Sequence, residues 1–203
     1  MLIGVDFDNT LAGYDHVFVA AAGERGWLPP GFAGGKREVR DAVRGLVDGE
    51  RRWMELQGEV YGPRMPEAEL IDGADRFLTR CRSEGMTVVV VSHKTEFGHF
   101  DPTRTRLHDA ARAWMTAKGF FDQAAFAVSE AFFEPTREGK IARIKALGCD
   151  VFIDDLEEVF LAPGFPAACR RLHLAGAAAG RCHGPFASYP GWAEIHDAVF
   201  PAA

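Results

Sequence analysis

The stretch Leu2-Ile3-Gly4-Val5-Asp6-Phe7-Asp8-Asn9-Thr10 sets the expected fold of this chain. It begins as a short apolar run and then turns acidic. Two further runs share its continuous apolar character: Met86-Thr87-Val88-Val89-Val90-Val91 and Val151-Phe152-Ile153. Continuous runs rich in β-branched residues are typical of strands that are buried on both faces of a parallel sheet. We therefore expect three central strands of such a sheet at these positions.

Helical patterns separate these runs, so the chain alternates between the two types of element. Apolar residues recur at helical spacing, with a glycine soon after, in three segments: 74–83, 107–118 and 140–147. Weaker apolar runs at 171–174 and 125–128 are candidates for a fourth and a fifth strand, and residues 192–199 for a last helix. This alternation predicts an α/β fold with a doubly wound, three-layer, Rossmann-like parallel sheet.

Residues 14–72 interrupt the alternation, because they contain no convincing strand. Glycine and proline residues divide this segment into three helical pieces: 15–25, 36–47 and 50–60. A connection of this length is too long for a single crossover helix. We expect a core domain made of residues 1–13 and 73–203, with residues 14–72 forming a small helical cap over the carboxyl edge of the sheet.

Composition narrows the class of protein. The 203 residues allow one domain, or one domain with an insert. Lys and Arg total 23 against 29 Asp and Glu, a formal net charge of −6, which makes a nucleic-acid partner unlikely by charge alone. No leader or membrane-spanning run stands out, so we expect a cytoplasmic protein with no membrane partner, and its oligomeric state stays open. Four widely spaced cysteines form no CxxC pair and are expected to be free thiols: Cys81, Cys149, Cys169 and Cys182.

Polar residues stand at the carboxyl ends of the expected central strands, where open α/β sheets bind their ligands. They are Asp6 and Asp8 after the first strand, Ser92, His93 and Lys94 after the second, Asp154 and Asp155 after the third, and Lys140 in the preceding helix. Converging carboxylates repel one another, and a hard divalent cation with oxygen ligands would offset their charge. Mg²⁺ prefers carboxylates together with a substrate phosphate, whose other oxygens Lys140 and Ser92 could hold. These residues predict a magnesium and phosphate site.

The run Asp6-Phe7-Asp8-Asn9-Thr10 resembles the DxDxT signature of the haloacid dehalogenase-like (HAD) superfamily. Three further motifs resemble those of the superfamily and follow in its order: the apolar strand closed by Ser92, the lysine Lys140 and the acidic pair Asp154-Asp155. The resemblance covers the chain outside the insert, which lies where members carry a C1-type cap. A carboxylate at Asp8 resembles the phosphatases and phosphotransferases of the superfamily and differs from its dehalogenases and transport ATPases.

The resemblance implies a role for each motif residue. Asp6 is the nucleophile that forms an aspartyl-phosphate, and Asp8 is the general acid and base. Thr10 steadies the loop that carries them. The transferring phosphoryl group is held by Ser92, His93 and Lys140. The Mg²⁺ ion is held by Asp6, the backbone carbonyl of Asp8, Asp154 and Asp155, and the resemblance leaves open which of the last two contacts the metal directly.

The expected reaction is hydrolysis of a small phosphomonoester, a sugar phosphate or a nucleotide, by a HAD-type phosphoric monoester hydrolase. Two alternatives stay open: phosphoryl transfer to an acceptor other than water, and a phosphate- or Mg²⁺-binding module without turnover. Candidates for selecting the small phosphorylated metabolite are Arg51, Arg52, Trp53 and Lys94. The competing interpretations are a solvated, self-paired helix face for the insert residues and a sheet-capping loop for Lys94.

Overall fold

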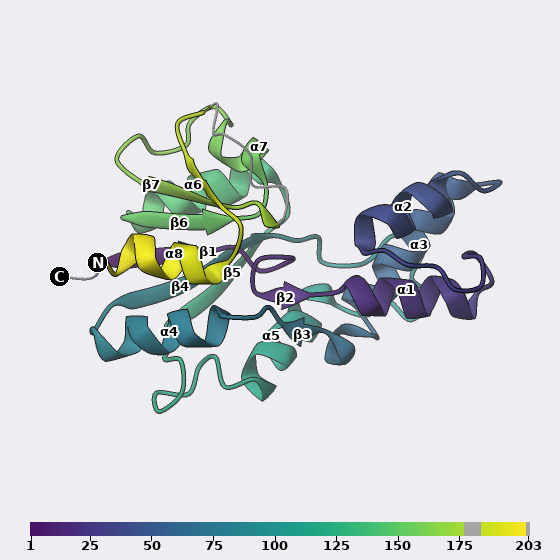
Figure 1. The fold of residues 1–203 in the computed structure, drawn as a ribbon, viewed down its shortest axis with the longest axis horizontal. Helices are drawn as coiled ribbons and strands as arrows, with labels where there is room; N and C mark the ends of the chain where they lie inside the picture. Colours follow the sequence, from purple (N-terminus) through teal and green to yellow (C-terminus); the bar gives the residue numbers. More distant parts are fainter. Residues whose placement is uncertain (177–183, 202–203) are drawn as a thin grey trace. The chain divides into compact units, whose positions relative to one another are not determined.

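Six strands pair in parallel in one sheet, in the order β5-β4-β1-β6-β7-β8, in a computed structural model that describes residues 1–176 and 184–201 (Figure 1). The strands are β1 (Leu2–Val5), β4 (Thr87–His93), β5 (Glu130–Glu134), β6 (Val151–Asp154), β7 (Arg170–Leu174) and β8 (Ala187–Tyr189). The chain adds strands to one side of β1 and then, from β6 on, to the other side. The strand order therefore reverses between β1 and β6, and open α/β sheets bind ligands at such a switch point. The predicted α/β class with a doubly wound parallel sheet is confirmed.

Successive residues of the central strands are all buried, because helices cover both faces of the sheet (Figure 1). Residues 88–91 of β4 show this, with no more than 5% exposure each. Val89 belongs to a buried cluster that includes Ile144 of α6. Phe77 of α4 packs against Trp192 of α8, with 4.9 Å between ring centres. The helices of this part of the chain are α4 (Ala74–Ser83), α6 (Arg137–Leu147), α7 (Glu157–Phe160) and α8 (Trp192–Val199).

The chain forms two compact units. The first contains the six-stranded sheet and consists of Met1–Ala12, Leu70–Lys94 and Met115–Ala203. The second consists of Gly13–Glu69 and Thr95–Trp114. The remaining elements are α1 (Asp15–Glu24), α2 (Lys36–Arg44), α3 (Gly49–Tyr61), the 3-10 helix η1 (Met65–Glu67), α5 (Leu107–Ala117) and the two-residue strands β2 (Ala12–Gly13) and β3 (Glu69–Leu70), which pair with each other.

Three helices form within residues 14–72, where the sequence predicts them. The second unit also recruits Thr95–Trp114, which the sequence assigns to the core. A close backbone contact joins the two segments: a Cβ atom at Gly98 would lie only 2.4 Å from the Cα atom of Gly58 in α3. The indole N–H of Trp114 also donates to the carbonyl of Ala68 at 2.9 Å. The role of residues 14–72 as a cap stays a prediction.

The fifth strand is not where the sequence analysis puts it. Residues 125 and 126 lie in a turn, and residues 127 and 128 belong to no helix or strand. The amides of Ala125 and Ala127 both donate to the carbonyl of Asp122, and Ala127 has a positive φ of 52°. The strand is β5, whose sequence begins and ends with glutamate. Because β5 lies at the edge of the sheet, it does not need the continuous apolar run of a central strand. The apolar ring of Phe126 instead packs on Phe120, 5.5 Å away.

Among residues 1–176 and 184–201, the structure contains no helix long and apolar enough to cross a membrane. Three of the four cysteines, Cys81, Cys149 and Cys169, are buried free thiols, as predicted. Cys182 lies outside the described residues.

Candidate active site

Asp6 occupies the first position after β1, where its amide donates to the carbonyl of Ile153 in β6 at 2.9 Å. The chain then folds back in a tight turn, in which the amides of Leu11 and Ala12 both bond to the carbonyl of Phe7. Asn9 takes a positive φ of 58° in this turn, a conformation that asparagine tolerates better than most side chains. The local sequence therefore forms a compact loop that holds both acids of the motif close to the end of β1.

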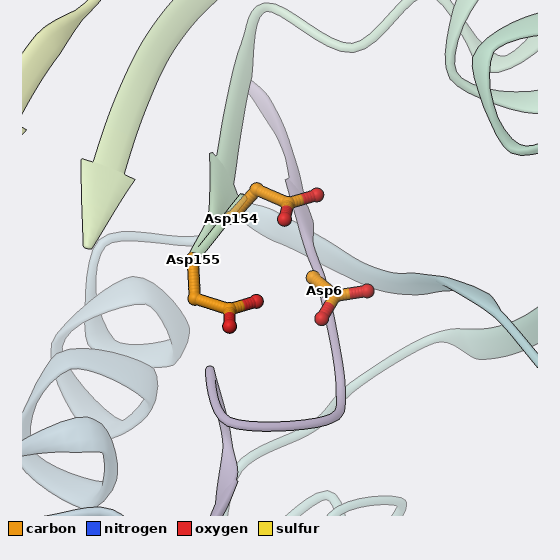
Figure 2. Close-up of side chains that lie close together, drawn as sticks. All are labelled: Asp6, Asp154 and Asp155. Carbon is orange, nitrogen blue, oxygen red and sulfur yellow. The ribbon is translucent and has the colours of Figure 1, made fainter. Parts of the chain in front are cut away.

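The carboxylates of Asp6, Asp154 and Asp155 converge at the switch point between β1 and β6 (Figure 2). One oxygen atom from each can be chosen so that all three lie within 4.8 Å of one another. Asp6 and Asp154 are buried, and Asp155 is half-buried. The Thr10 hydroxyl lies 3.4 Å from an oxygen of Asp6 and 3.4 Å from one of Asp155, so it bridges the two acids. These oxygen atoms form a donor set that suits a hard cation.

Lys140 enters this cluster from α6. The helix begins earlier than the predicted residue 140, because the hydroxyl of Thr136 caps it by accepting from the Gly139 amide at 3.0 Å. Lys140 Nζ lies 2.5 Å from Oδ1 of Asp6 and 2.6 Å from Oδ2 of Asp154. Burial acts to lower the pKa of Lys140, but the negative charges of Asp154 and Asp6 outweigh burial and raise it. Lys140 is therefore a protonated, buried partner of both acids.

Asp154 is the most deeply buried carboxylate of the cluster. Burial raises the pKa of Asp154 to about 7, Lys140 acts against that shift, and the charge of Asp6 adds to it. The ammonium group of Lys140 contacts two of the three carboxylates, those of Asp6 and Asp154. A divalent cation bound beside Asp154 would favour its ionised form. The residues present therefore fit a hard divalent metal ion.

Backbone and side-chain contacts hold the acidic pair in place. Oδ1 of Asp154 accepts from the amide of Leu156 at 3.0 Å. A ring nitrogen of His173 in β7 lies 3.1 Å from the carbonyl of Asp155, and its other ring nitrogen lies 3.0 Å from the hydroxyl of Ser188 in β8. Neighbouring strands on this side of the sheet therefore fix the backbone of the acidic pair. The sequence analysis did not connect His173 with the site, because the pairing of β6 with β7 is a tertiary feature.

Asp8 lies apart from the three converging carboxylates and pairs with a different lysine. Nζ of Lys94 lies 3.0 Å from Oδ1 and 2.8 Å from Oδ2 of Asp8. Ser92 is buried at the end of β4, whereas His93 is exposed, with a ring nitrogen 3.1 Å from the carbonyl of Pro135. Of the strand-end residues, Asp6, Asp154, Asp155, Lys140 and Thr10 form one cluster of contacts, and Asp8 and Lys94 form a second pair in the same unit.

The three substrate-selection candidates of the insert lie in the second unit, where each contacts other residues of that unit. Arg51 pairs with Glu55 at 2.9 Å. Arg52 stacks over the ring of Trp27 at 5.3 Å. Trp53 is 3% exposed and stacks on a neighbouring aromatic ring. Contact of these three side chains with a substrate stays a prediction.

The loop after β1 has one further anchor that the sequence analysis missed. The indole N–H of Trp192, the first residue of α8, donates to the carbonyl of Thr10 at 2.9 Å. Trp192 is buried, and its contact with Phe77 of α4 fixes the ring. A tryptophan at the start of a predicted helix gives no sign of its hydrogen-bond partner, so only the folded chain reveals this contact.

Comparisons with known proteins rest on the fold. No protein-family model matches the sequence, and no curated protein matches it. The fold, however, is similar to that of many solved structures. The chain is similar to a HAD family hydrolase from Deinococcus radiodurans with bound phosphate and sodium (15% identity, 98% of this chain and 94% of that chain, TM-score 0.58). It is similar to a HAD hydrolase from Bacillus subtilis bound to magnesium (12%, 99% and 98%, TM-score 0.57).

A third similar structure is a predicted phosphoglycolate phosphatase from Haemophilus somnus (16% identity, 98% of this chain and 97% of that chain, TM-score 0.53). At such low identity, a likeness between structures shows the fold. It covers nearly the full length of each chain, in agreement with the resemblance of the four motifs. The chain therefore has the fold of the HAD-superfamily hydrolases.

Proposed function

We propose that this protein is a Mg²⁺-dependent phosphatase that hydrolyses a small phosphomonoester through an aspartyl-phosphate on Asp6. The observation that carries the proposal is the arrangement around Asp6, a buried carboxylate at the switch point of the sheet. It is hydrogen-bonded to Lys140, and one oxygen each of Asp6, Asp154 and Asp155 lie within 4.8 Å of one another, close enough to bind the same metal ion. Solved structures of the same fold are named as hydrolases and phosphatases, one with bound phosphate and another with magnesium. These names support the proposal without extending to this chain's substrate.

The metal ion would be held by carboxylate oxygens of Asp6, Asp154 and Asp155, together with the backbone carbonyl of Asp8. When bound, Mg²⁺ would neutralise charge on the phosphoryl oxygens and help to orient them for attack. The all-oxygen donor set favours this ion over zinc, which prefers nitrogen and sulfur ligands.

The first half of the reaction forms the covalent intermediate. A carboxylate oxygen of Asp6 attacks phosphorus, and the bond from phosphorus to the ester oxygen breaks. Asp8, in its protonated form, gives a proton to the leaving oxygen, so that an alcohol departs. The ammonium group of Lys140 lies beside Asp6, where it can stabilise the extra negative charge that gathers around the phosphoryl group.

The second half regenerates the enzyme. A water molecule attacks phosphorus, Asp8 accepts a proton from that water, and the bond between phosphorus and the Asp6 oxygen breaks to release inorganic phosphate. Asp8 thus returns to its starting protonation state over one cycle. Ser92 and His93 are the further proposed ligands of the phosphoryl oxygens. The hydroxyl of Thr10 holds the carboxylates of Asp6 and Asp155 in place. Residues 14–72 are the proposed C1-type cap, with a sugar phosphate or a nucleotide as the substrate class.

Phosphate release from a panel of phosphorylated metabolites, with Mg²⁺ and with excess chelator, tests the proposed function. We expect turnover that needs the metal and that falls by about 10⁴-fold or more in Asp6→Asn, because the amide is a very poor nucleophile. Circular dichroism of the variant should match that of the wild type. Full activity in Asp6→Asn, or in chelator, would contradict the mechanism. Tight binding of a panel member without phosphate release would favour a binding module instead.

The same assay distinguishes the phosphotransferase alternative. If the phosphoryl group passes to an acceptor other than water, adding alcohols or sugars should raise the rate at which substrate disappears above the rate of phosphate release. Equal rates across the acceptor series support hydrolysis.

A further inference from the structure

Lys94 is a second buried lysine of the unit that contains the sheet, and its ammonium group contacts the carboxylate of Asp8. Lys94 Nζ lies within 3.0 Å of both carboxylate oxygens of Asp8, at 3.0 and 2.8 Å. The Lys94 side chain is 2% exposed, and that of Asp8 is 18% exposed. Since little water reaches this pair, its charges are screened less than those of a surface ion pair. The ammonium group therefore restricts the orientations that the Asp8 carboxylate can adopt.

Contacts with the sheet hold both the backbone amide and the ammonium group of Lys94. Its amide donates to the carbonyl of Glu134 at 2.9 Å, which extends the pairing of β4 with β5 by one residue. Its ammonium group lies 5.6 Å from the centre of the Phe7 ring, and Phe7 in turn packs edge-to-face on Phe133 of β5. A lysine held in this way is a rigid donor. The position of Asp8 is thus coupled to the end of β4 as well as to its own loop.

We propose that Lys94 is the positioning residue for Asp8, an inference that rests on the proposed function of Asp8 in proton transfer. Lys94 acts through hydrogen bonds to the carboxylate and exchanges no proton with the substrate. Asp8 gives its proton to the leaving oxygen in the first half-reaction and takes one from water in the second. Both transfers require a carboxylate oxygen held within hydrogen-bond reach of the reacting oxygen.

The competing role for Lys94 is the one that the sequence suggests, direct contact with the substrate. The two roles differ in the group through which the lysine acts. A positioning residue loses its effect when Asp8 no longer transfers protons, whereas a substrate ligand keeps its effect. A cycle of single and double variants separates the two roles.

The experiment compares wild type, Lys94→Met, Asp8→Asn and the double variant with phenyl phosphate and Mg²⁺. We expect Lys94→Met to lower kcat by about 10- to 100-fold with a small change in KM, because general acid–base catalysis contributes a factor of this order or more. In the Asp8→Asn background, the same change at Lys94 should alter kcat by less than about 2-fold. Lys94→Arg should recover part of the loss, since it retains a charged donor.

A second substrate of nearly the same shape isolates the proton transfer. The leaving group of p-nitrophenyl phosphate is a much weaker base than phenolate, so it departs with little help from an acid. In Lys94→Met, the rapid first release of nitrophenol should stay within about 3-fold of wild type, while the later release of phosphate, which needs Asp8 as a base, should slow by about 10-fold or more. A burst of nitrophenol should therefore appear in the variant.

Controls keep the outcomes distinct. Lys145→Met, at an exposed lysine in the last turn of α6, should leave the activity unchanged. If Lys94→Met does not fold by circular dichroism, Lys94→Gln, which removes the positive charge and shortens the side chain, takes its place in the cycle. Equal multiplicative losses in the wild-type and Asp8→Asn backgrounds, or a loss that appears in KM for both esters, would overturn the positioning role. An inactive wild type overturns the proposed function, and this inference with it.

Discussion

Nζ of Lys140 lies 2.5 Å from Oδ1 of Asp6, although 134 residues separate the two in the sequence. The same ammonium group lies 2.6 Å from Asp154, the last residue of β6. A single lysine from α6 thus joins the acids that end two neighbouring strands. Because all three side chains are buried, the charge of each is balanced mainly by the others, and removal of any one should be costly.

Replacing Lys140 by methionine should destabilise the metal-free protein by about 3–5 kcal/mol, because two buried carboxylates lose their partner. Urea unfolding in the presence of chelator measures this change. Lys145→Met, at an exposed position of the same helix, is the matched control and should change the free energy of unfolding by less than about 0.5 kcal/mol. Similar losses in the two variants would show that the buried cluster contributes nothing specific.

Magnesium should stabilise the folded protein, because the acidic cluster exists only in the folded state. At a concentration 100 times its Kd, the ion adds about 2.7 kcal/mol, which corresponds to a rise in Tm of about 5–10 °C for a chain of this size. Asp154→Asn should lose most of that rise. Differential scanning calorimetry with and without MgCl₂ checks both expectations, and Ca²⁺ serves as a second oxygen-seeking ion. An equal rise in the variant would remove Asp154 from the metal site.

Gly98→Ala should destabilise the second unit by about 1–3 kcal/mol, because the added methyl group would collide with the backbone of Gly58. The matched control is Gly23→Ala in α1, where nothing lies within 4 Å of the added Cβ atom. That change should stabilise the chain by about 0.5–1 kcal/mol, because alanine is the better helix former. Chemical denaturation measures both. A harmless Gly98→Ala would mean that the 95–114 segment does not pack on α3.

The described cysteines should resist alkylation in the folded protein. Burial raises the pKa of Cys81 and of Cys169 to about 12 and, with the charge of Asp150, that of Cys149 to about 11. A raised pKa means less of the reactive thiolate, at most about one thiol in a thousand at pH 8. Mass spectrometry after iodoacetamide treatment should find these three unmodified in buffer and modified in urea. Rapid labelling in buffer would contradict their burial.

The sequence predicted those parts of the fold that depend on local patterns. The apolar runs of β1, β4 and β6 are continuous because helices cover both faces of these strands. The local sequence pattern is therefore enough to predict all three strands. The edge strand β5 escaped because an edge position does not demand that pattern, and residues 125–128 are apolar for a different reason, the packing of Phe126 on Phe120. The contacts of the 95–114 segment with the rest of the second unit include a close approach of two glycines and a hydrogen bond from the Trp114 indole, and no sequence pattern marks either.

In the candidate site, too, some neighbours could be predicted from the sequence and others could not. Strand-end acids and Lys140 could be proposed as neighbours because parallel strands bring their carboxyl ends together. The partner of Lys94 could not be proposed, since a lysine after a strand can reach solvent, substrate or a neighbouring loop. Only the folded chain shows that its ammonium group lies within hydrogen-bond distance of Asp8.

The hydrogen bond from Trp192 to Thr10 has a consequence for the order in which the molecule is assembled. During synthesis, the partner of Thr10 is made 182 positions after Thr10 itself. Contacts of such wide sequence separation form late and slow the folding of a domain. A nascent chain stalled before residue 192 would carry every acid and lysine of the candidate site and still lack the indole that secures the loop after Asp6.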